Sequence, residues 1–347
     1  DIFTFFGINQ EFDLKQLRSF WQEHVDHVKM TDHHMCLYIH IPFCRKKCTY
    51  CSLSNWMYAG ESQLDHYVDY LISEMEIFND IFKDVQFQNF QFRGGTANLL
   101  TDQQLRRLFQ AVHERFSFSD RAQFTCECNP YESTRETLKI FHDFGFRRIS
   151  FGVQSADQEV LKCANRGYQN FDDVQSVISS VRGFSGFEWI NADLLIGLYN
   201  DSPVKVYESF CRLSDLRVES ISVYPLSLTH YYFKRYYQGK KDVFDAELER
   251  KLRDFEALVT PAAQKAGYQF FSLKELTPDH QFWQFLRSDA LEAKENIPDY
   301  KTRDVIFDCL GLGVGSWSIM ANRIYYREFD ALSRRPGSAE KRYEGLF

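Results

Sequence analysis

Short apolar segments alternate with amphipathic segments between residues 36 and 226. The apolar segments are β-prone, and the amphipathic ones repeat their apolar residues at the spacing typical of helices. Strict alternation of this kind predicts a parallel sheet covered by helices. The expected strands are 36–41, 87–92, 123–128, 147–153, 188–196 and 219–226, and the expected helices are about 62–82, 102–116, 133–144, 157–181 and 203–217.

Six strand–helix units are too few to close a complete eight-stranded barrel. We therefore expect an α/β fold with a partial (β/α)6 TIM-like barrel over residues 36–230. Apolar residues at helical spacing predict an N-terminal helical extension over 1–35. A helix over 245–266 and a following strand predict a C-terminal α+β extension over 231–347 that covers the active site. Four histidines of the N-terminal extension are interpreted as part of a solvated polar face: His24, His27, His33 and His34.

Composition narrows the class of protein. The chain has 347 residues, of which 44% are hydrophobic, enough for a sizeable core. A formal net charge of −7 argues against nucleic acid as a partner. We find no run of 18 apolar residues, so no membrane segment is expected. Nine cysteines in a chain of this length do not suggest a disulfide framework, so a reducing, cytoplasmic location is expected. The start at Asp1 suggests a trimmed terminus.

Three cysteines, Cys44, Cys48 and Cys51, lie in one loop at C-x3-C-x2-C spacing. The loop follows the first expected strand, which Pro42 ends. A structural zinc usually takes four ligands in two distant pairs, and no second C-x2-C pair occurs in the chain. Three thiolates suit a 4Fe–4S cluster that leaves one iron open to a further ligand. The spacing therefore favours a cluster over zinc.

Polar and glycine residues follow or end the later strands, where β/α barrels place their active sites. A Gly-Gly-Thr turn follows strand two, Glu127 ends strand three, Gln154 ends strand four, and Asp193 lies late in strand five. Strand alternation turns Glu127 away from Cys126 and Cys128, which we interpret as core residues. Gln154 and Arg166 can hold a carboxylate or a ribose, and Asp193, an acid in an apolar strand, can bind a ribose.

Two further motifs can be interpreted either as functional or as purely structural. Arg45, Lys46 and Lys47 are either a solvated edge of the cysteine loop or a patch that attracts an acidic electron donor such as flavodoxin. The Gly311-Leu312-Gly313-Val314-Gly315 run imitates a nucleotide-binding loop but lacks the strand–helix context and spacing of that motif.

These segments, in this order, resemble the radical S-adenosylmethionine (SAM) superfamily, and within it the HemN-like branch of oxygen-independent coproporphyrinogen III dehydrogenases. The matching pieces span residues 36 to about 320: LYIHIPFCRKKCTYC, RGGTANLL, ECNP, RISFGVQS, ANR at 164–166, NADLLIGL, SVYPLSL and DCLGLGVGSWS. The resemblance implies that the open iron chelates SAM, which one electron cleaves to methionine and a 5′-deoxyadenosyl radical. It also implies a small-molecule substrate.

By motif, Cys44, Cys48 and Cys51 would hold the 4Fe–4S cluster. Arg93 would put a guanidinium near the active site, where it could pair with a substrate carboxylate. Two SAM molecules are expected. The implied SAM contacts are Tyr38, Tyr50, Gly94, Gly95, Thr96, Glu127, Gln154, Arg166 and Asp193, with Ser227 and Trp317 near adenine or the second SAM.

Three departures from the pattern of the branch bear on the reaction: Arg93 in place of the first glycine of a triplet, Ala97 after Gly-Gly-Thr, and Tyr199 after Gly-Leu. They favour a reaction other than coproporphyrinogen oxidation. The first expectation is carbon alkylation of an unsaturated or aromatic substrate, by methylation or cyclopropanation with the second SAM. Tetrapyrrole chemistry is the alternative, either oxidative decarboxylation or haem ring opening. A haem-binding chaperone is an alternative of another class.

Overall fold

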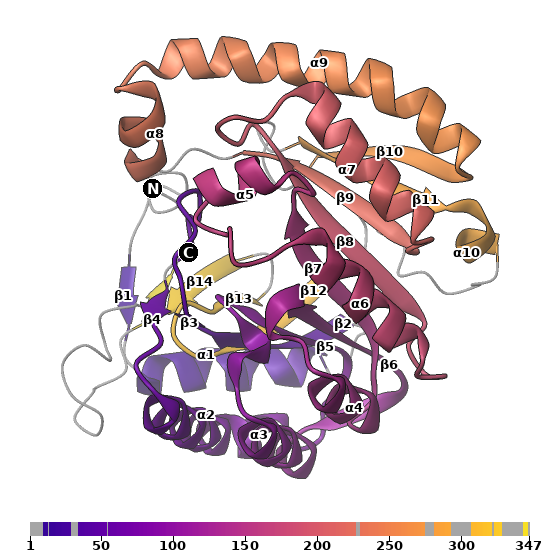
Figure 1. Cartoon of the computed structure of the whole chain (residues 1–347). Helices are drawn as coiled ribbons and strands as arrows, with labels where there is room; N and C mark the ends of the chain where they lie inside the picture. The colour runs from indigo at the N-terminus through magenta and orange to yellow at the C-terminus, as the bar shows by residue number, and fades with distance from the viewer. Residues whose placement is uncertain are drawn as a thin grey trace.

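A computed structural model describes residues 10–12, 14–28, 34–53, 55–226, 230–274, 281–292, 307–320, 323–327 and 343–345. Six parallel strands stand side by side in chain order at its centre (Figure 1). The sequence predicted five of them to within two residues at each end, while the third begins six residues before its expected start. The α/β fold with a partial barrel is confirmed. The strands are β2 (His34–Ile41), β5 (Gln86–Gly94), β6 (Ser117–Cys128), β7 (Phe146–Gln154), β8 (Trp189–Ile196) and β9 (Ser220–Pro225).

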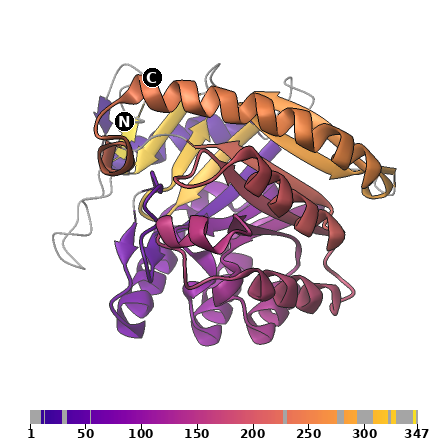
Figure 2. The same cartoon turned by 45° about the horizontal axis from the view of Figure 1, so that its top comes forward.

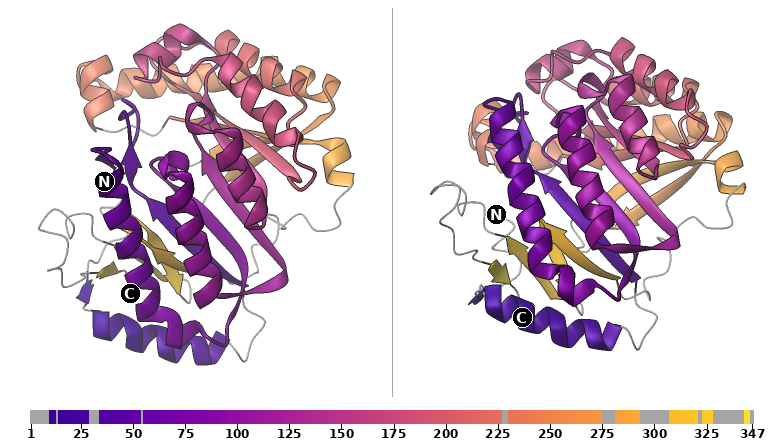
Figure 3. Two further views of the ribbon diagram at one scale, coloured as in Figure 1. Left: turned by 60° about the horizontal axis from the view of Figure 1, so that its bottom comes forward. Right: turned by 90° about the horizontal axis from the view of Figure 1, so that it is seen from below.

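Amphipathic helices cover the outer face of these strands (Figures 2 and 3). The cap of α3 is Thr101 and that of α4 is Thr134. Thr101 also forms a capping box with Gln104, a pattern that stabilises a helix start. The helices are α2 (Glu61–Phe82), α3 (Asp102–Arg115), α4 (Arg135–Asp143), α6 (Phe171–Arg182) and α7 (Pro203–Asp215).

The single helix expected over 157–181 is wrong, because the chain leaves the helix between α5 (Gln158–Cys163) and α6. Asn165 takes a left-handed backbone with a φ of 59°, a conformation that ends a helix. The connecting segment contacts the cysteine loop, as shown below, so the break positions part of the site.

Strands of the C-terminal region extend the sheet at both edges. β12 (Phe307–Leu312) pairs in parallel with β2, and β11 (Gln281–Arg287) pairs antiparallel with β9. The described part of the sheet therefore has 13 strands, and the barrel passes into the extensions without a break in hydrogen bonding. The division into 1–35, 36–230 and 231–347 stays a prediction. The outer strands are β13 (Trp317–Met320), β14 (Arg323–Arg327), β15 (Tyr343–Gly345) and β1 (Gln10–Phe12) beyond β12, and β10 (Tyr268–Lys274) beyond β11.

The N-terminal helix α1 (Leu14–Val28) packs against α2 and buries Trp21 completely. His24 of α1 contacts the buried Asp308 of β12, with 2.8 Å between Nε2 and Oδ2. His24 is therefore not part of a solvated face, as the sequence suggested, but joins the two ends of the chain. The helical N-terminal extension itself is confirmed.

Two helices follow β9, α8 (His230–Tyr237) and the long α9 (Lys241–Lys265), which crosses the top of Figure 1. α9 packs on α7 and β10. A search of the described helices for one that is long and apolar enough to cross a bilayer finds none. The remaining elements are a two-stranded pair, β3 (Phe43–Cys44) with β4 (Trp56–Met57), the short α10 (Ser288–Glu292) and two 3-10 turns at Ala97–Leu99 and Pro130–Glu132.

Candidate active site

The three loop cysteines lie at the end of β2, and each sulfur accepts a hydrogen bond from a different side chain. Thr96 Oγ1 lies 3.4 Å from Cys44 Sγ. Arg166 Nη1 lies 3.6 Å from Cys48 Sγ, and Asn55 Nδ2 lies 3.6 Å from Cys51 Sγ. Sulfurs surrounded by donors are suited to be thiolates, and such hydrogen bonds tune the sulfurs of iron–sulfur clusters.

Without iron the thiols of Cys44 and Cys51 hold their protons. Burial raises the pKa of Cys44 to about 11, and the neighbouring thiols add to the rise. Burial likewise raises the pKa of Cys51. Among the described residues, no three His, Cys, Asp or Glu side chains are gathered closely enough to hold a metal ion as they stand. Metal binding releases thiol protons and draws ligands together. The donor set of three thiolates, each with its own hydrogen-bond donor, fits a 4Fe–4S cluster.

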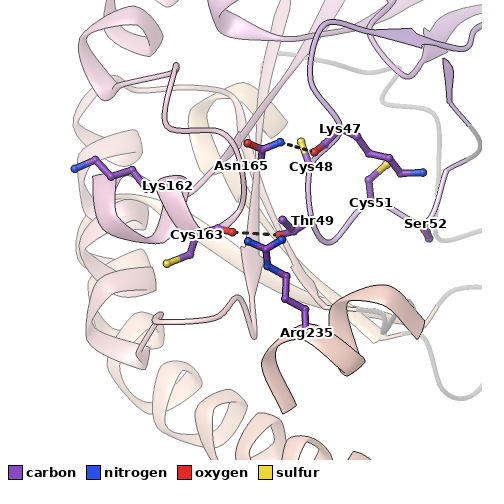
Figure 4. A pocket seen from close by; sticks show the side chains of 9 residues that line it. All are labelled: Lys47, Cys48, Thr49, Cys51, Ser52, Lys162, Cys163, Asn165 and Arg235. Carbon is purple, nitrogen blue, oxygen red and sulfur yellow. Dashed lines mark hydrogen bonds between the residues drawn. The ribbon is translucent and has the colours of Figure 1, made fainter. Parts of the chain in front are cut away.

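The segment between α5 and α6 holds the cysteine loop from one side (Figure 4). Asn165 Nδ2 donates to the carbonyl of Lys47 at 2.8 Å, and the amide of Thr49 donates to the carbonyl of Ala164 at 3.1 Å. The Thr49 hydroxyl donates to the carbonyl of Cys163 at 3.3 Å. The left-handed turn at Asn165 is therefore a contact surface for the loop.

Arg166 lies beneath this contact and is only 7% exposed. Its Nη2 donates to the carbonyl of Gly152 at 2.8 Å and to Gln169 Oε1 at 2.7 Å. Its Nε, also buried, has no partner among the described residues. The guanidinium thus links the cysteine loop to β7. Its assignment to SAM stays a prediction, with Nε as the group still able to donate.

The glycines after β5 have a packing role that the sequence did not show. Gly94 has a φ of +143°, and a Cβ there would lie 2.3 Å from the carbonyl oxygen of Ile41. A Cβ at Gly95 would lie 2.9 Å from Cys44 Sγ. The two glycines therefore let the end of β5 approach β2 and the first cluster cysteine. Their contact with SAM stays a prediction.

Inside the barrel, Arg93 of β5 and Glu127 of β6 form an ion pair of 2.7 Å. The side chains are 33% and 41% exposed, so both face open space. Arg93 is paired with Glu127, and its contact with a substrate carboxylate stays a prediction. Cys126 and Cys128 point to the other face and lie in the main hydrophobic core, as alternation predicted.

Asp193 of β8 is the centre of a hydrogen-bond network. Its Oδ2 accepts from the Ser150 hydroxyl and its Oδ1 from Asn191 Nδ2, both at 2.7 Å. Burial, and then the charge of Glu127, raise the pKa of Asp193 to about 7. This carboxyl therefore carries only part of a negative charge at neutral pH, and a cationic or hydroxyl-bearing ligand would increase that charge. The sequence identified Asp193 but missed Ser150 and Asn191, because nothing in a strand motif says which hydroxyls meet across strands.

Tyr38 and Trp317 lie close together, with ring centroids 5.4 Å apart. The Tyr38 hydroxyl also hydrogen-bonds His40 Nδ1. Gln154 ends β7 with a φ of 68°, a strained conformation for a side chain of this kind. Tyr50 packs against a hydrophobic cluster that includes Val160, Leu198 and Tyr232. Their roles, like that of Thr96, stay predictions, and Ser227 lies outside the described residues.

The glycine-rich run at 311–315 is a turn between β12 and β13 and not a nucleotide loop. Glu74 of α2 accepts from the amide of Gly313 at 2.8 Å. The hydroxyl of Tyr67 accepts from the amide of Val314 at 3.0 Å and donates to the carbonyl of His40 at 2.8 Å. A Cβ at Gly311 would collide with the carbonyl of Trp317. Protein side chains thus occupy the amides that a phosphate would need.

Two cavities adjoin these residues. One of about 610 Å³ lies beside the cysteine loop, and Arg235 of α8 rises towards it in Figure 4. It carries three cationic residues, Lys47, Lys162 and Arg235. The acidic electron donor stays a prediction. The other, of about 210 Å³, lies inside the barrel and includes the Arg93–Glu127 pair and Asp193.

The cysteines provide a direct test of the two strand faces. Replacing Cys44, Cys48 or Cys51 by alanine is expected to abolish cluster binding, because each removes one of three ligands. Replacing Cys126 by alanine should leave iron and sulfide content unchanged, since its sulfur lies in the core. Iron and sulfide analysis after anaerobic reconstitution measures both. Loss of the cluster in Cys126→Ala, with its unfolding midpoint preserved, would show that the faces are misassigned.

Comparison with known proteins places this geometry in a family. The family model of the radical SAM superfamily matches residues 38–210. Oxygen-independent coproporphyrinogen III oxidase of Salmonella typhimurium is 27% identical over 309 residues, which cover 85% of this chain and 65% of the relative. The chain thus spans just under two thirds of that relative. The heme chaperone HemW of Lactococcus lactis is 27% identical over 292 residues, covering 83% of this chain and 70% of the chaperone.

The solved structure of coproporphyrinogen III oxidase (HemN) from Escherichia coli shares the fold. Its TM-score is 0.73 at 24% sequence identity, with 94% of this chain and 74% of that chain covered. The superposition therefore includes the extensions as well as the barrel.

These comparisons correct the first expectation for the reaction. Carbon alkylation with a second SAM as the carbon donor is wrong, because the relatives reported above are named for tetrapyrrole chemistry. The departures at Ala97 and Tyr199 were therefore not a sign of methyl transfer. The cysteine loop, the barrel and the relatives agree, and the chain belongs to the radical SAM superfamily, in its HemN-like branch.

Proposed function

We propose that this radical SAM enzyme acts on a tetrapyrrole, and that it oxidises a carboxylate-bearing side chain as oxygen-independent coproporphyrinogen III oxidases do. The observation that carries the proposal is the similarity to those oxidases over 85% of the chain, joined to a barrel that keeps the cysteine loop and its three sulfur-directed donors.

The residues around the cysteine loop would have different roles in binding the cluster and SAM. Cys44, Cys48 and Cys51 would hold the 4Fe–4S cluster, and SAM bound to it supplies one-electron hydrogen abstraction. Glu127 and Asp193 lie where an ammonium group or a ribose can be bound from inside the barrel. Arg166 fixes the position of Cys48. We also propose that a second SAM binds near Tyr38 and Trp317.

The proposed reaction converts a propionate side chain to a vinyl group and releases CO2. One hydrogen atom leaves the side chain and ends in 5′-deoxyadenosine. The electron that remains passes to an external one-electron acceptor. The barrel contributes by binding the carboxylate-bearing side chain and keeping water from the reacting carbon.

The test is an anaerobic incubation of the reconstituted enzyme with coproporphyrinogen III, SAM, a reductant and an electron acceptor. We expect 5′-deoxyadenosine, methionine and a tetrapyrrole that has lost CO2 and two hydrogens from a side chain, as read by mass spectrometry. The Cys48→Ala variant serves as the control and should give none of the three products.

The similarity to the heme chaperone HemW supplies a second candidate in the same experiment. A chaperone would bind haem in a one-to-one ratio and leave coproporphyrinogen III unchanged. That result would contradict the oxidase proposal and favour the chaperone.

A further inference from the structure

The interior of a β/α barrel is normally a packed core of branched apolar side chains. Here it is a cavity of about 210 Å³ lined mainly by polar groups. The liquid volume of a water is about 30 Å³, so the cavity has room for about seven waters, or for a short side chain, but not for a macrocycle. Its walls come from β5, β6, β7, β8, β9 and β11 and include Thr125, Arg148, Trp189, Ser222 and Gln284.

Strand register places the charged groups at two levels. Arg93 and Glu127 lie near the carboxyl ends of β5 and β6. Arg148 lies near the start of β7, beside Thr125 of β6 and Trp189 of β8. The cavity therefore runs from the loop end of the barrel, where the cysteines are, towards its opposite end.

Charge is balanced at the upper level of the cavity, near the carboxyl ends of the strands, and not at the lower level, where Arg148 lies. Glu127 is paired with Arg93, and both oxygens of Asp193 accept hydrogen bonds from neutral groups. Arg148 Nη1 contacts Gln123 Oε1 at 3.4 Å, and the guanidinium lies 5.3 Å from the ring centre of Trp189. Within the described ranges, no carboxylate lies within 4.0 Å of Arg148. A half-buried cation without an acidic partner is a ready site for an anion.

Two neutral donors share the cavity with Arg148. No hydrogen bond joins the Thr125 hydroxyl or the Gln284 side-chain amide to another side chain in the part of the chain that the structure describes. A carboxylate accepts about four hydrogen bonds, and a guanidinium with an amide and a hydroxyl can supply them. The small volume of the cavity and the donors Arg148, Thr125 and Gln284 together favour a carboxylate on a short aliphatic arm as the ligand.

The geometry points to a substrate-carboxylate subsite at the lower level of the barrel, with Arg148 as its cationic anchor and Thr125 and Gln284 as its neutral donors. This inference rests on the proposed function for its occupant, a propionate carboxylate of the tetrapyrrole. Arg148 is thus a specificity-determining residue.

The first experiment uses propionate alone and does not depend on the tetrapyrrole. The thermal unfolding midpoint of the reconstituted protein is measured with sodium propionate and with sodium chloride at equal ionic strength. Propionate is expected to stabilise the wild type more than chloride does, and this difference should vanish in Arg148→Gln. The matched control is Arg147→Gln, since Arg147 bonds the carbonyls of His142 and Phe146 and does not line the cavity. An equal response of wild type and Arg148→Gln overturns the subsite.

The second experiment measures the binding of coproporphyrin III and its tetramethyl ester by fluorescence. Arg148→Gln should weaken binding of the acid about tenfold or more and leave the ester unchanged, because hydrogen bonds to charged groups are the strong ones. Arg148→Lys, which keeps the charge, should recover part of the affinity and shows that the site still folds. Unchanged binding of the acid in Arg148→Gln overturns the inference. A propionate response that needs Arg148, without tetrapyrrole binding by the wild type, supports the subsite and contradicts the proposed function.

Discussion

Replacing Arg166 with glutamine is expected to make the 4Fe–4S cluster harder to reduce, by roughly 60 mV, a tenfold change in a one-electron equilibrium. Reduction adds negative charge to the cluster, and the guanidinium stabilises that charge through its hydrogen bond to Cys48 Sγ. Because Arg166 is 7% exposed, water does not screen the interaction. An EPR-monitored redox titration of the reconstituted protein without SAM measures the potential.

The matched control is Arg45→Gln in the same loop. Arg45 is 50% exposed and pairs with Glu132 at 3.0 Å, away from the sulfurs. Its loss should leave the potential unchanged. Arg166→Lys keeps the charge but not the fork that reaches Gly152 and Gln169, so an intermediate potential is expected. If Arg166→Gln binds a full cluster with the wild-type potential, Arg166 does not tune the cluster. The only predicted role left for Arg166 is then to bind SAM.

Replacing Lys251 of α9 with methionine is expected to lower the free energy of unfolding by about 3–5 kcal/mol, the typical loss when one partner of a buried ion pair is removed. Lys251 Nζ lies 2.5 Å from Asp201 Oδ1, with side-chain exposures of 6% and 2%. Although burial lowers it, the Asp201 carboxylate raises the pKa of Lys251 above its ordinary value. The variant would leave Asp201 buried and unpaired with lysine.

Denaturant unfolding measures the change. Lys241→Met in the same helix is the control, because its pair with Asp245 is exposed and such pairs contribute at most about 1 kcal/mol. The double variant Lys251→Met with Asp201→Asn should recover part of the loss, since no buried charge then remains. Equal stability of Lys251→Met and Lys241→Met would refute the buried-pair account.

Elements and motifs that depend on local pattern were predictable from the sequence. Strands β2 and β5 to β9 have continuous apolar or alternating residues, and their order follows from β–α alternation. The cysteine loop was predictable because its three ligands are adjacent in sequence. Cys126 and Cys128 were placed on the core side by alternation alone.

Contacts between distant segments were not predictable. His24 meets Asp308, 284 residues away, and nothing near either residue marks the pair. Lys251 and Asp201 are 50 residues apart and look like ordinary surface residues in the sequence. Arg148 sits inside a family motif but is not distinguished from Arg147 until the strand faces are known. The break at Asn165 was missed because helical spacing continues on both sides of it.

The parallel pairing of β2 with β12 also sets the order in which the protein can be completed. β2, which precedes the cysteine loop, gains β5 as a neighbour early in synthesis. Its other neighbour, residues 307–312, leaves the ribosome only after the whole barrel has been made. Until then, one edge of β2 presents unpaired amides and carbonyls, which favour pairing with other chains. Contacts of such long range also fold slowly. The cysteine loop is therefore made long before the strand that precedes it gains both of its neighbours.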